Sequence, residues 1–231
     1  MSTNLAQQLR EGTTKSHSMA ENVSFVKSFL GGVVDKKSYR QLVANLFFVY
    51  VAIEEQIEKN KYNKSISGLY FPELNRCDSL IEDLEFYYGK NWKNEINASL
   101  ATKIYVNRIH DIGENQPELL IAHAYTRYMG DLSGGQILKK IAQNAMQLPK
   151  DSGTSFYNFK EIEDENKFKI IYRDALNNVP LTDLQIQQII AEANTAFNLN
   201  MKVFQELNSN LIKIMIMLLL STINNLRKKL R

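Results

Sequence analysis

The least ordinary stretch of the sequence is a cluster of glycines inside an otherwise helical pattern. Gly130, Gly134 and Gly135 fall within six residues, and each glycine inside a helix costs about 1 kcal/mol relative to alanine. Gly130 and Gly134 are four residues apart, so they share one helical face and expose bare backbone there. This face predicts either a surface against which a flat ligand lies or a close helix crossing or kink, and the spacing leaves both open.

A carboxylate and a guanidinium accompany these glycines. Asp131 lies four residues after Arg127 and four residues before Gly135, so the charged groups can share a face beside the exposed backbone. An acid in this place could hold ordered water against a bound ligand. An ordinary ion pair on a wet helix surface is the alternative, and it would contribute only a few tenths of a kcal/mol.

The sequence holds three histidines, His17, His110 and His123, so any metal site must be poor in imidazole. Glu21 follows His17 by four residues and Arg10 precedes it by seven, which places the three side chains along one helical face. Seven helical residues rise about 10.5 Å, close to the distance from the centre of a porphyrin to its carboxylate edge. One helix could thus bind iron, fix the imidazole tautomer and hold a propionate. An isolated histidine is otherwise more often a surface or half-buried residue.

Other features narrow the classes of function. Lys169 and Arg173, again four apart, fit a carboxylate clamp and fit a solvated helix face equally well. The sequence has no nucleophile elbow, no GxxxxGK[ST] loop and no GxGxxG turn, which argues against hydrolase, P-loop and dinucleotide-binding functions. The single cysteine, Cys77, excludes an internal disulfide and a thiolate cluster. A net charge of +3 is too small to indicate a nucleic-acid binder.

The elements that must position these residues are helices. Glycine and proline number only 10 and 4 among 231 residues, and helical periodicity continues along the chain without sustained alternation. We therefore predict an all-α fold with a single domain. The predicted helical segments are 5–30, 36–59 with Asp35 as its cap, 78–88, 92–112, 117–149, 160–177, and a last long helix from Thr182 and Asp183 to 207.

The last residues, 209–231, form an apolar and basic tail. Its apolar run from Leu211 to Ile223 is shorter than the roughly 20 residues needed to cross a bilayer, so stable membrane insertion is not expected. We expect a final helix packed on the domain, with an anchor at the membrane interface as the alternative. The amino end has neither a secretory nor a transit-peptide composition.

Three segments resemble the heme oxygenase family: GTTKSHSMAEN around His17, FVYVAIEEQIEKN around Tyr50, and HAYTRYMGDLSGGQILKKIAQ. The resemblance covers roughly residues 4–208, and it implies a heme oxygenase domain over 1–208 followed by the tail over 209–231. The implied fold is a helical bundle in which haem lies between a proximal N-terminal helix and a glycine-rich distal helix.

The resemblance also implies a role for each candidate residue. His17 is the expected axial ligand of the haem iron, steadied by Glu21, and Asp131 is the expected distal carboxylate that organises water. The implied catalytic residues are Asp131, Tyr50, Arg127, Asn200, Gly130 and Gly134. The implied haem-binding residues are Arg10, His17, Glu21, Tyr125, Lys169, Arg173, Gly135, Phe197 and Phe204, with Phe29 as a further wall aromatic.

The implied reaction oxidises haem with dioxygen and electrons, releasing biliverdin IX-alpha, ferrous iron and carbon monoxide. Asp131 is expected to deliver a proton through water, and Lys169 and Arg173 to fix which edge of the macrocycle reacts. A non-catalytic haem sensor or storage protein is the first alternative. A helical interaction protein without a ligand is the second.

The electrons must come from another protein, because no flavin or nicotinamide motif is present. We expect a ferredoxin donor, which basic residues such as Lys139 and Lys140 could steer, and a monomeric chain that binds no nucleic acid. Biliverdin would then supply bilin pigment synthesis in a photosynthetic host. Abundant Asn, Ile and Lys suit an AT-rich genome, so the expected location is the plastid stroma if the gene is plastid-encoded, or otherwise the bacterial cytoplasm.

Overall fold

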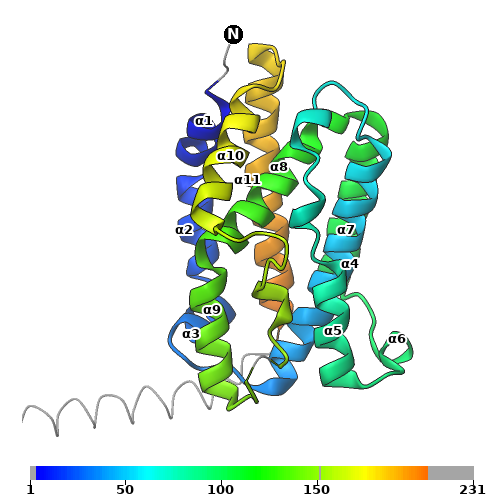
Figure 1. Cartoon of the computed structure of the whole chain (residues 1–231), viewed down its shortest axis with the longest axis vertical. Coiled ribbons are helices and arrows are strands. Elements are labelled where there is room, and N and C mark those ends of the chain that lie inside the picture. Colours follow the sequence, from blue (N-terminus) through cyan, green and yellow to red (C-terminus); the bar gives the residue numbers. More distant parts are fainter. Residues whose placement is uncertain (1–3, 151, 208–231) are drawn as a thin grey trace, which may run out of the picture.

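A computed structural model describes residues 4–150 and 152–207, and its elements are helices joined by short connections (Figure 1). No strand occurs in these described residues, which confirms the predicted all-α fold. The predicted tail, 209–231, lies outside them. The helices are α1 (Leu5–Gly12), α2 (Thr14–Glu21), α3 (Ser24–Leu30), α4 (Lys36–Lys59), α5 (Cys77–Tyr88), α6 (Trp92–Glu95), α7 (Leu100–Asn115), α8 (Leu120–Ala124), α9 (Gly130–Met146), α10 (Glu165–Asn177) and α11 (Asp183–Glu206). Shorter elements are the 3-10 turns η1 (Ser67–Leu69), η2 (Pro72–Leu74), η3 (Pro117–Leu119) and η5 (Ser155–Tyr157), and the π-helical turn η4 (Tyr125–Met129).

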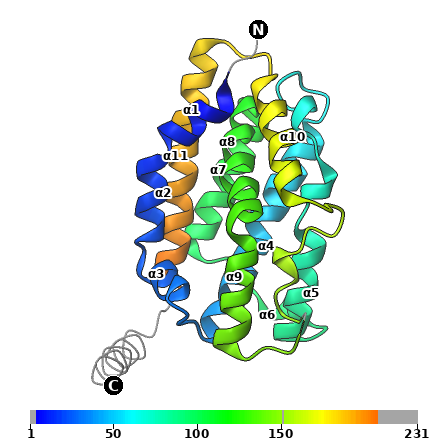
Figure 2. The same cartoon turned by 60° about the vertical axis from the view of Figure 1, so that its left-hand side comes forward.

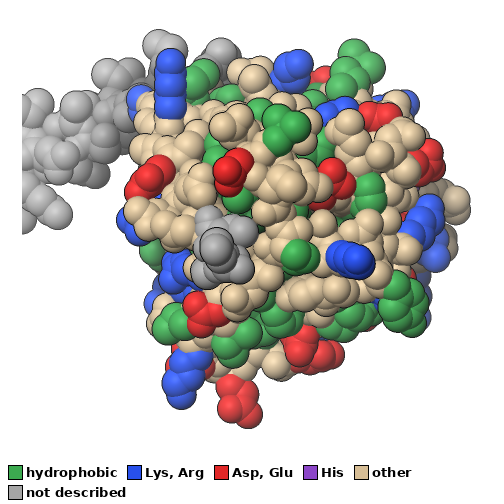
Figure 3. Space-filling model, turned by 90° about the horizontal axis from the view of Figure 1, so that it is seen from above, with side chains coloured by type: hydrophobic (Ala, Val, Ile, Leu, Met, Phe, Trp, Pro, Cys, Tyr) green, Lys and Arg blue, Asp and Glu red, His purple; other side chains and the backbone are tan. Residues whose placement is uncertain are grey.

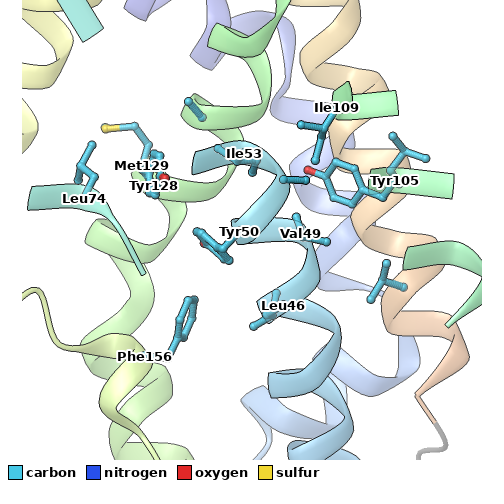
Figure 4. Close-up of a cluster of buried hydrophobic side chains, with 14 of the residues drawn as sticks. Leu46, Val49, Tyr50, Ile53, Leu74, Tyr105, Ile109, Tyr128, Met129 and Phe156 are labelled. Carbon is cyan, nitrogen blue, oxygen red and sulfur yellow. The ribbon is translucent and has the colours of Figure 1, made fainter. Parts of the chain in front are cut away.

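The core forms around α4, which packs against α5, α7 and α8. Leu46, Val49, Tyr50 and Ile53 of α4 recur at helical spacing and are all buried, so this face of the helix is apolar along its length. Figure 4 shows these side chains within a cluster that also contains Tyr105 and Ile109 of α7 and Tyr128 of η4. Within this cluster Tyr50 is fully buried.

Side-chain caps determine where several helices begin. The Asp35 carboxylate accepts hydrogen bonds from the backbone N–H groups of Lys37 and Ser38, both at 3.0 Å, and this confirms the predicted start of α4. Thr182 and Gln185 form a capping box at the predicted start of α11. α10 begins at Glu165, later than the predicted residue 160, because the side chain of Asp164 caps it.

The predicted helical region 5–30 consists of three helices that follow one side of α11 (Figure 2). At Gly12 the chain approaches α11 so closely that a Cβ atom would lie 2.5 Å from Cγ2 of Ile190. The Thr13 hydroxyl, next in the chain, donates to the carbonyl oxygen of Leu9 at 2.7 Å, and Val23 adopts an extended conformation before α3. These breaks keep the segment in contact with α11.

The predicted helix 92–112 was wrong as a single element, because it is divided into α6 and α7. Ser99 caps α7, and Oδ1 of Asn45 on α4 accepts from the Ser99 backbone N–H at 3.1 Å and from the Thr102 hydroxyl at 2.7 Å. Trp92, the first residue of α6, and Ile96, the residue after its end, are both buried. A polar side chain on a distant helix therefore helps to decide where α7 begins.

The predicted segment 117–149 is also composite, because η3, α8, η4 and α9 follow one another within it. π-helical turns inside α-helices frequently mark functional sites, and η4 lies directly before the glycine cluster. α9 ends at Met146, where Gln147 adopts a left-handed conformation with φ of 49°. Within the described part of the chain, no helix is both long and apolar enough to cross a membrane.

Candidate functional site

A cleft of about 710 Å³ is lined by residues of the N-terminal helices α1 and α2 and of η4, α9, α10 and α11. Its volume is within the range of small-molecule and cofactor sites. One part of the lining comes from α1, which contributes Arg10, and from α2, which contributes His17 and Glu21. Another part comes from η4, which contributes Tyr125, and from α9, which contributes Gly130 and Gly134. The helices α10 and α11 contribute Arg173 and Phe197, respectively. All eight of these residues were predicted from the sequence. The other lining residues are Ala6, Thr13, Thr14, Thr126, Met129 and Ser133.

The first wall presents an accessible imidazole. The side chain of His17 is 60% exposed, and its Nδ1 atom lies 3.6 Å from Oε1 of Glu21. The edge of the Phe197 ring supports the imidazole, with 5.8 Å between the ring centroids and 73° between the planes. Because Nδ1 faces Glu21, Nε2 is the nitrogen available to a ligand in the cleft.

The opposite wall has two positions without side chains. A Cβ atom added at Gly130 or at Gly134 would meet no atom within 4 Å, so both glycines border open space. A Cβ at Gly135 would lie 3.4 Å from Cδ1 of Tyr157, so this third glycine allows close packing inside the protein. The cluster therefore combines open space at two glycines with close packing at the third.

One buried hydroxyl in the lining has no partner. Oγ1 of Thr126 is shielded from solvent and makes no hydrogen bond within the described structure. A buried polar group in this state costs about 1–3 kcal/mol, and a polar atom of a ligand or an ordered water would satisfy it. Together with the open space at Gly130 and Gly134, this hydroxyl indicates that the cleft is built to be filled.

Two guanidinium groups mark the rim of the cleft. Arg10 and Arg173 are exposed and come from α1 and α10, respectively. Burial raises the pKa of the Tyr125 hydroxyl, whereas the charges of Arg173 and Arg10 oppose the rise, so the three groups lie near one another. Two cations beside one hydroxyl form a site suited to the carboxylates of a ligand.

A buried polar group lies next to the glycine wall. The Tyr50 hydroxyl donates to Oδ2 of Asp131 and accepts a hydrogen bond from Nε of Arg127 at 3.0 Å. Arg127 also donates from Nη2 to Oδ1 of Asp131 at 3.3 Å, and from Nη1 to Oδ1 of Asn200 at 3.0 Å. Residues from α4, η4, α9 and α11 thus converge on one carboxylate, although none of them lines the cleft itself.

The environment of Asp131 alters its acidity. Burial raises the pKa of the carboxyl group above its usual value, while the Arg127 charge and the hydrogen bond from Tyr50 partly oppose the rise. Burial also raises the pKa of Tyr50 well above its usual value, so the phenol keeps its proton and remains a donor. A carboxyl group whose pKa is moved toward neutral pH is suited to hold and transfer protons.

The structure places several expected residues outside the lining. Lys169 is half-buried on α10, one turn before Arg173. Phe204 lines a second hollow and stacks on Phe25 with 6.4 Å between the ring centroids. Phe29 is buried in the core, where its ring meets Tyr39 at 5.9 Å between centroids.

The sequence reasoning missed Thr126, Met129 and Ser133. A usable signal was present for two of them, because Thr126 lies four residues before Gly130 and Ser133 lies three residues after it. No such spacing connects Met129 to either glycine.

Charged side chains elsewhere give little indication of a nucleic-acid surface. Figure 3 shows acidic and basic side chains interspersed over the end of the molecule seen from above.

No group of three or more His, Cys, Asp or Glu side chains among the described residues could hold a metal ion.

Comparisons with known proteins agree with this arrangement. The sequence model of the heme oxygenase family matches residues 3–206. A heme oxygenase from Porphyra purpurea is 63% identical over 229 residues, which cover 99% of this chain and 97% of the relative. Heme oxygenase 1 from a Synechocystis strain is 60% identical over 213 residues, or 92% of this chain and 88% of the relative.

The fold agrees as well. The crystal structure of heme oxygenase-1 from the cyanobacterium Synechocystis, in complex with heme, superposes with a TM-score of 0.89 at 57% identity and covers 95% of this chain and 99% of that one. A heme oxygenase from Leptospira interrogans superposes with a TM-score of 0.86 at 48% identity, covering 90% of this chain and 100% of that one. Because the family model spans residues 3–206, which include the helices of both cleft walls, the chain belongs to the heme oxygenase family.

Proposed function

We propose that the chain binds haem in the cleft and opens it with dioxygen and electrons, releasing biliverdin IX-alpha, ferrous iron and carbon monoxide. The observation that carries this proposal is the accessible imidazole of His17 in the cleft that Gly130 and Gly134 line without side chains. Bound haem supplies the iron at which dioxygen is activated. The family membership and a relative crystallised with heme support the choice of substrate.

His17 holds the iron through Nε2, while Glu21 favours the tautomer with a proton on Nδ1. A neutral imidazole pushes less electron density toward the iron than a thiolate does, so the ligand suits an oxidation of the macrocycle itself. Gly130 and Gly134 let the backbone approach the face of the ring, and Phe197 keeps the imidazole in place.

Asp131 holds and transfers a proton through ordered water. Tyr50 and Arg127 orient its two carboxylate oxygens, and Asn200 orients Arg127 in turn. Gly135 contributes by letting α9 pack on Tyr157. Arg10 and Arg173 hold the propionates with Tyr125, while Lys169 adds charge nearby and Phe204 and Phe29 support the surrounding walls.

Turnover with a chemical reductant tests the proposal. The purified chain is mixed with haemin, and the Soret band is followed after ascorbate is added under air. We expect the band to decay into a bilin spectrum, with carbon monoxide trapped by a reporter haemoprotein. A Soret band that forms and persists would instead identify a haem sensor or storage protein, and no Soret shift at all would identify a protein without this ligand.

We expect a leucine at position 134 to separate stability from ligand binding. Gly134→Leu should stabilise the haem-free protein by about 1 kcal/mol, because leucine is the better helix former and the position borders open space. The same side chain would occupy the cleft and weaken haem binding at least about tenfold, as measured by titration. Gly135→Ala is the matched control on the same helix and should leave haem affinity unchanged. Equal affinity for Gly134→Leu and the parent would exclude haem from this wall.

The rim cations should control which edge of the ring reacts. Arg10→Gln combined with Arg173→Gln should convert a single biliverdin isomer into a mixture, because the macrocycle could rotate once its propionates lose their partners. The isomers are separated by chromatography after single turnover. Lys169→Gln alone should have a smaller effect, since this side chain lies outside the lining. If the double variant still yields one isomer, the shape of the cleft alone selects the edge.

We further propose that a ferredoxin supplies the electrons to a monomeric chain and that the product serves bilin pigment synthesis. Relatives from red algae, a cryptophyte and cyanobacteria support this, and with them a location in the plastid stroma or the bacterial cytoplasm. Lys140 is exposed on α9 and could steer an acidic donor, while Lys139 bonds to Oδ1 of Asn158 at 2.9 Å. Rising ionic strength should then slow turnover driven by ferredoxin but not turnover driven by ascorbate.

A further inference from the structure

A second hollow, of about 520 Å³, is lined by residues of α2, α3 and the end of α11. α2 and α3 both pack on α11, as Figure 2 shows. An apolar lining comes from Met19, Phe25, Met201, Phe204 and Leu207, and none of the described residues in the lining is charged. Because a charge would be costly to bury here, the hollow suits an apolar occupant.

The helix α2 is poorly covered by the rest of the described structure. None of its eight residues, Thr14–Glu21, is buried. His17 and Glu21 line the cleft, whereas Ser18 and Met19 line the second hollow, where Met19 is 50% exposed. Helices in proteins are stabilised mostly by the packing of one face, so α2 lacks a cover on the side of the hollow.

The chain passes out of the described structure at this hollow. Leu207 follows α11, is buried and belongs to the lining. Its φ of −75° and ψ of 116° are extended, so α11 does not continue straight into the residues that follow. The Glu206 carboxylate accepts from the backbone N–H of Ala101 at 3.1 Å and holds this end of α11 against α7. The chain therefore continues from the edge of the hollow.

The sequence after Leu207 matches the hollow in polarity and length. Residues 208–210 are Asn-Ser-Asn, which favour a turn because their side chains bond to nearby backbone. The apolar run from Leu211 to Ile223 contains one charged residue, Lys213. Three extended residues span about 10 Å, so the run can begin beside the hollow. As a helix it would be about 20 Å long.

Helical spacing distinguishes two faces of this run. Leu211, Met215 and Leu218 recur at i, i+4 and i+7 and share one face. Lys213 and Leu220 are seven residues apart and share the opposite face. The first face is the one suited to burial, because the second carries the charge.

Another apolar surface near the end of α11 is a poorer match. Leu100 and Ile104 on α7 are 70% and 47% exposed, beside Ala101, to which Glu206 bonds. Lys103 is exposed next to them, whereas no described residue in the lining of the hollow is charged. The hollow is therefore the better partner for the apolar run.

We propose that residues 211–223 form a helix that docks in the second hollow of the same chain, with Met215 and Leu218 on its buried face. The docked segment covers Met19 and completes the packing of α2, the helix that carries His17. The inference does not rest on the proposed function, because it concerns the haem-free chain.

Oxidation of methionine in the haem-free, full-length chain tests the docking, because peroxide converts an accessible methionine into its sulfoxide. Met217 lies four residues after Lys213, on the face opposite Met215. At low conversion we expect Met215 and Met19 to oxidise at least about fivefold more slowly than Met217, because a docked side chain reacts only when the segment opens. Tandem mass spectrometry reads each site.

Two results of this measurement would contradict the proposal. Equal rates at Met215 and Met217 would show that the segment has no buried face. Slow oxidation of Met215 with a Met19 as reactive as Met217 would show that the segment packs on another surface, such as that of Leu100 and Ile104.

Two leucines of the run provide a matched pair of variants. Leu218→Asn puts an amide on the docking face, so Met19 and Met215 should now oxidise within about twofold of Met217. Leu220→Asn puts the same amide on the opposite face and should leave the slow oxidation unchanged. Both changes lie outside the described helices, so the domain should fold in each variant. An equal effect of the two variants would overturn the assigned face and the docking with it.

Other occupants of the hollow or other partners of the run would give different results. Protection that increases with protein concentration would assign the hollow to the run of a second copy. Protection of Met215 and Met217 together, only when vesicles of anionic phospholipid are added, would assign the run to a membrane surface. Either result would overturn docking within one chain. We expect protection that depends on neither protein concentration nor vesicles.

Discussion

Replacement of His17 by alanine should abolish the histidine-ligated Soret spectrum and weaken haem binding by more than about 100-fold. Loss of a partner that only orients a metal ligand costs about 10- to 100-fold in affinity, so loss of the ligand itself should cost more. His17 is the only histidine in the cleft lining, so no other imidazole there can replace it. The measurement is a titration with haemin followed by absorbance.

Two controls make this result specific. His110 is half-buried and lies outside the cleft, where its Nδ1 atom is 2.9 Å from Nε2 of Gln56, so His110→Ala should bind haem like the parent. Imidazole added to His17→Ala should restore a histidine-like spectrum, because it can fill the space that the side chain leaves. An unchanged spectrum of His17→Ala without imidazole would assign the iron ligand to another residue.

Asp131→Ala should reduce biliverdin formation by about 10²- to 10⁴-fold, the usual contribution of a positioned proton donor or acceptor. Haem binding should remain close to that of the parent, because Asp131 does not belong to the cleft lining. Product formation would fall because the carboxyl group that transfers the proton is missing. In addition, Arg127 would keep its hydrogen bonds to Tyr50 and Asn200 but lose its anionic partner. Product is measured by extraction and chromatography after a single turnover.

Asp131→Asn distinguishes the proton from the shape of the site. The amide keeps the size of the side chain and one acceptor oxygen, yet it does not ionise and so cannot act as an acid or base at neutral pH. We therefore expect Asp131→Asn to be nearly as inactive as Asp131→Ala while retaining haem. A normal yield of biliverdin from either variant would refute the proton-transfer role and leave only the backbone of α9 at this wall.

The N-terminal half of the site illustrates what helical spacing can predict. Arg10, His17 and Glu21 were placed on one face from their separations alone, and all three line the cleft. The helices break between Gly12 and Thr14, yet the three side chains still face the same space. Gly130 and Gly134 were found in the same way, since a glycine pair four residues apart has one possible face in a helix.

The polar group around Asp131 shows where spacing stops being informative. Tyr50, Asp131 and Asn200 are far apart in the chain and meet only because α4, α9 and α11 pack together. Spacing identified Asp131 beside Arg127 and the glycines, but it could not have found Tyr50 or Asn200, which the sequence indicated only through the resemblance to a family. The placement of Gly135 against Tyr157, and of Phe204 in a second hollow, was equally beyond local pattern.

The sequence alone determined that the protein is helical, where most helices begin, and which side chains share the proximal face. These properties depend on neighbours three or four residues away, and the hydrophobic repeat and the caps record them directly. The tertiary structure alone decided the division of 5–30 and 92–112 into shorter helices, the burial that raises the pKa of Asp131, and the hydrogen bonds of Arg127 to Asp131 and Asn200. Burial and hydrogen bonds between distant residues exist only after the helices have packed, because they depend on distances in space that no local spacing encodes.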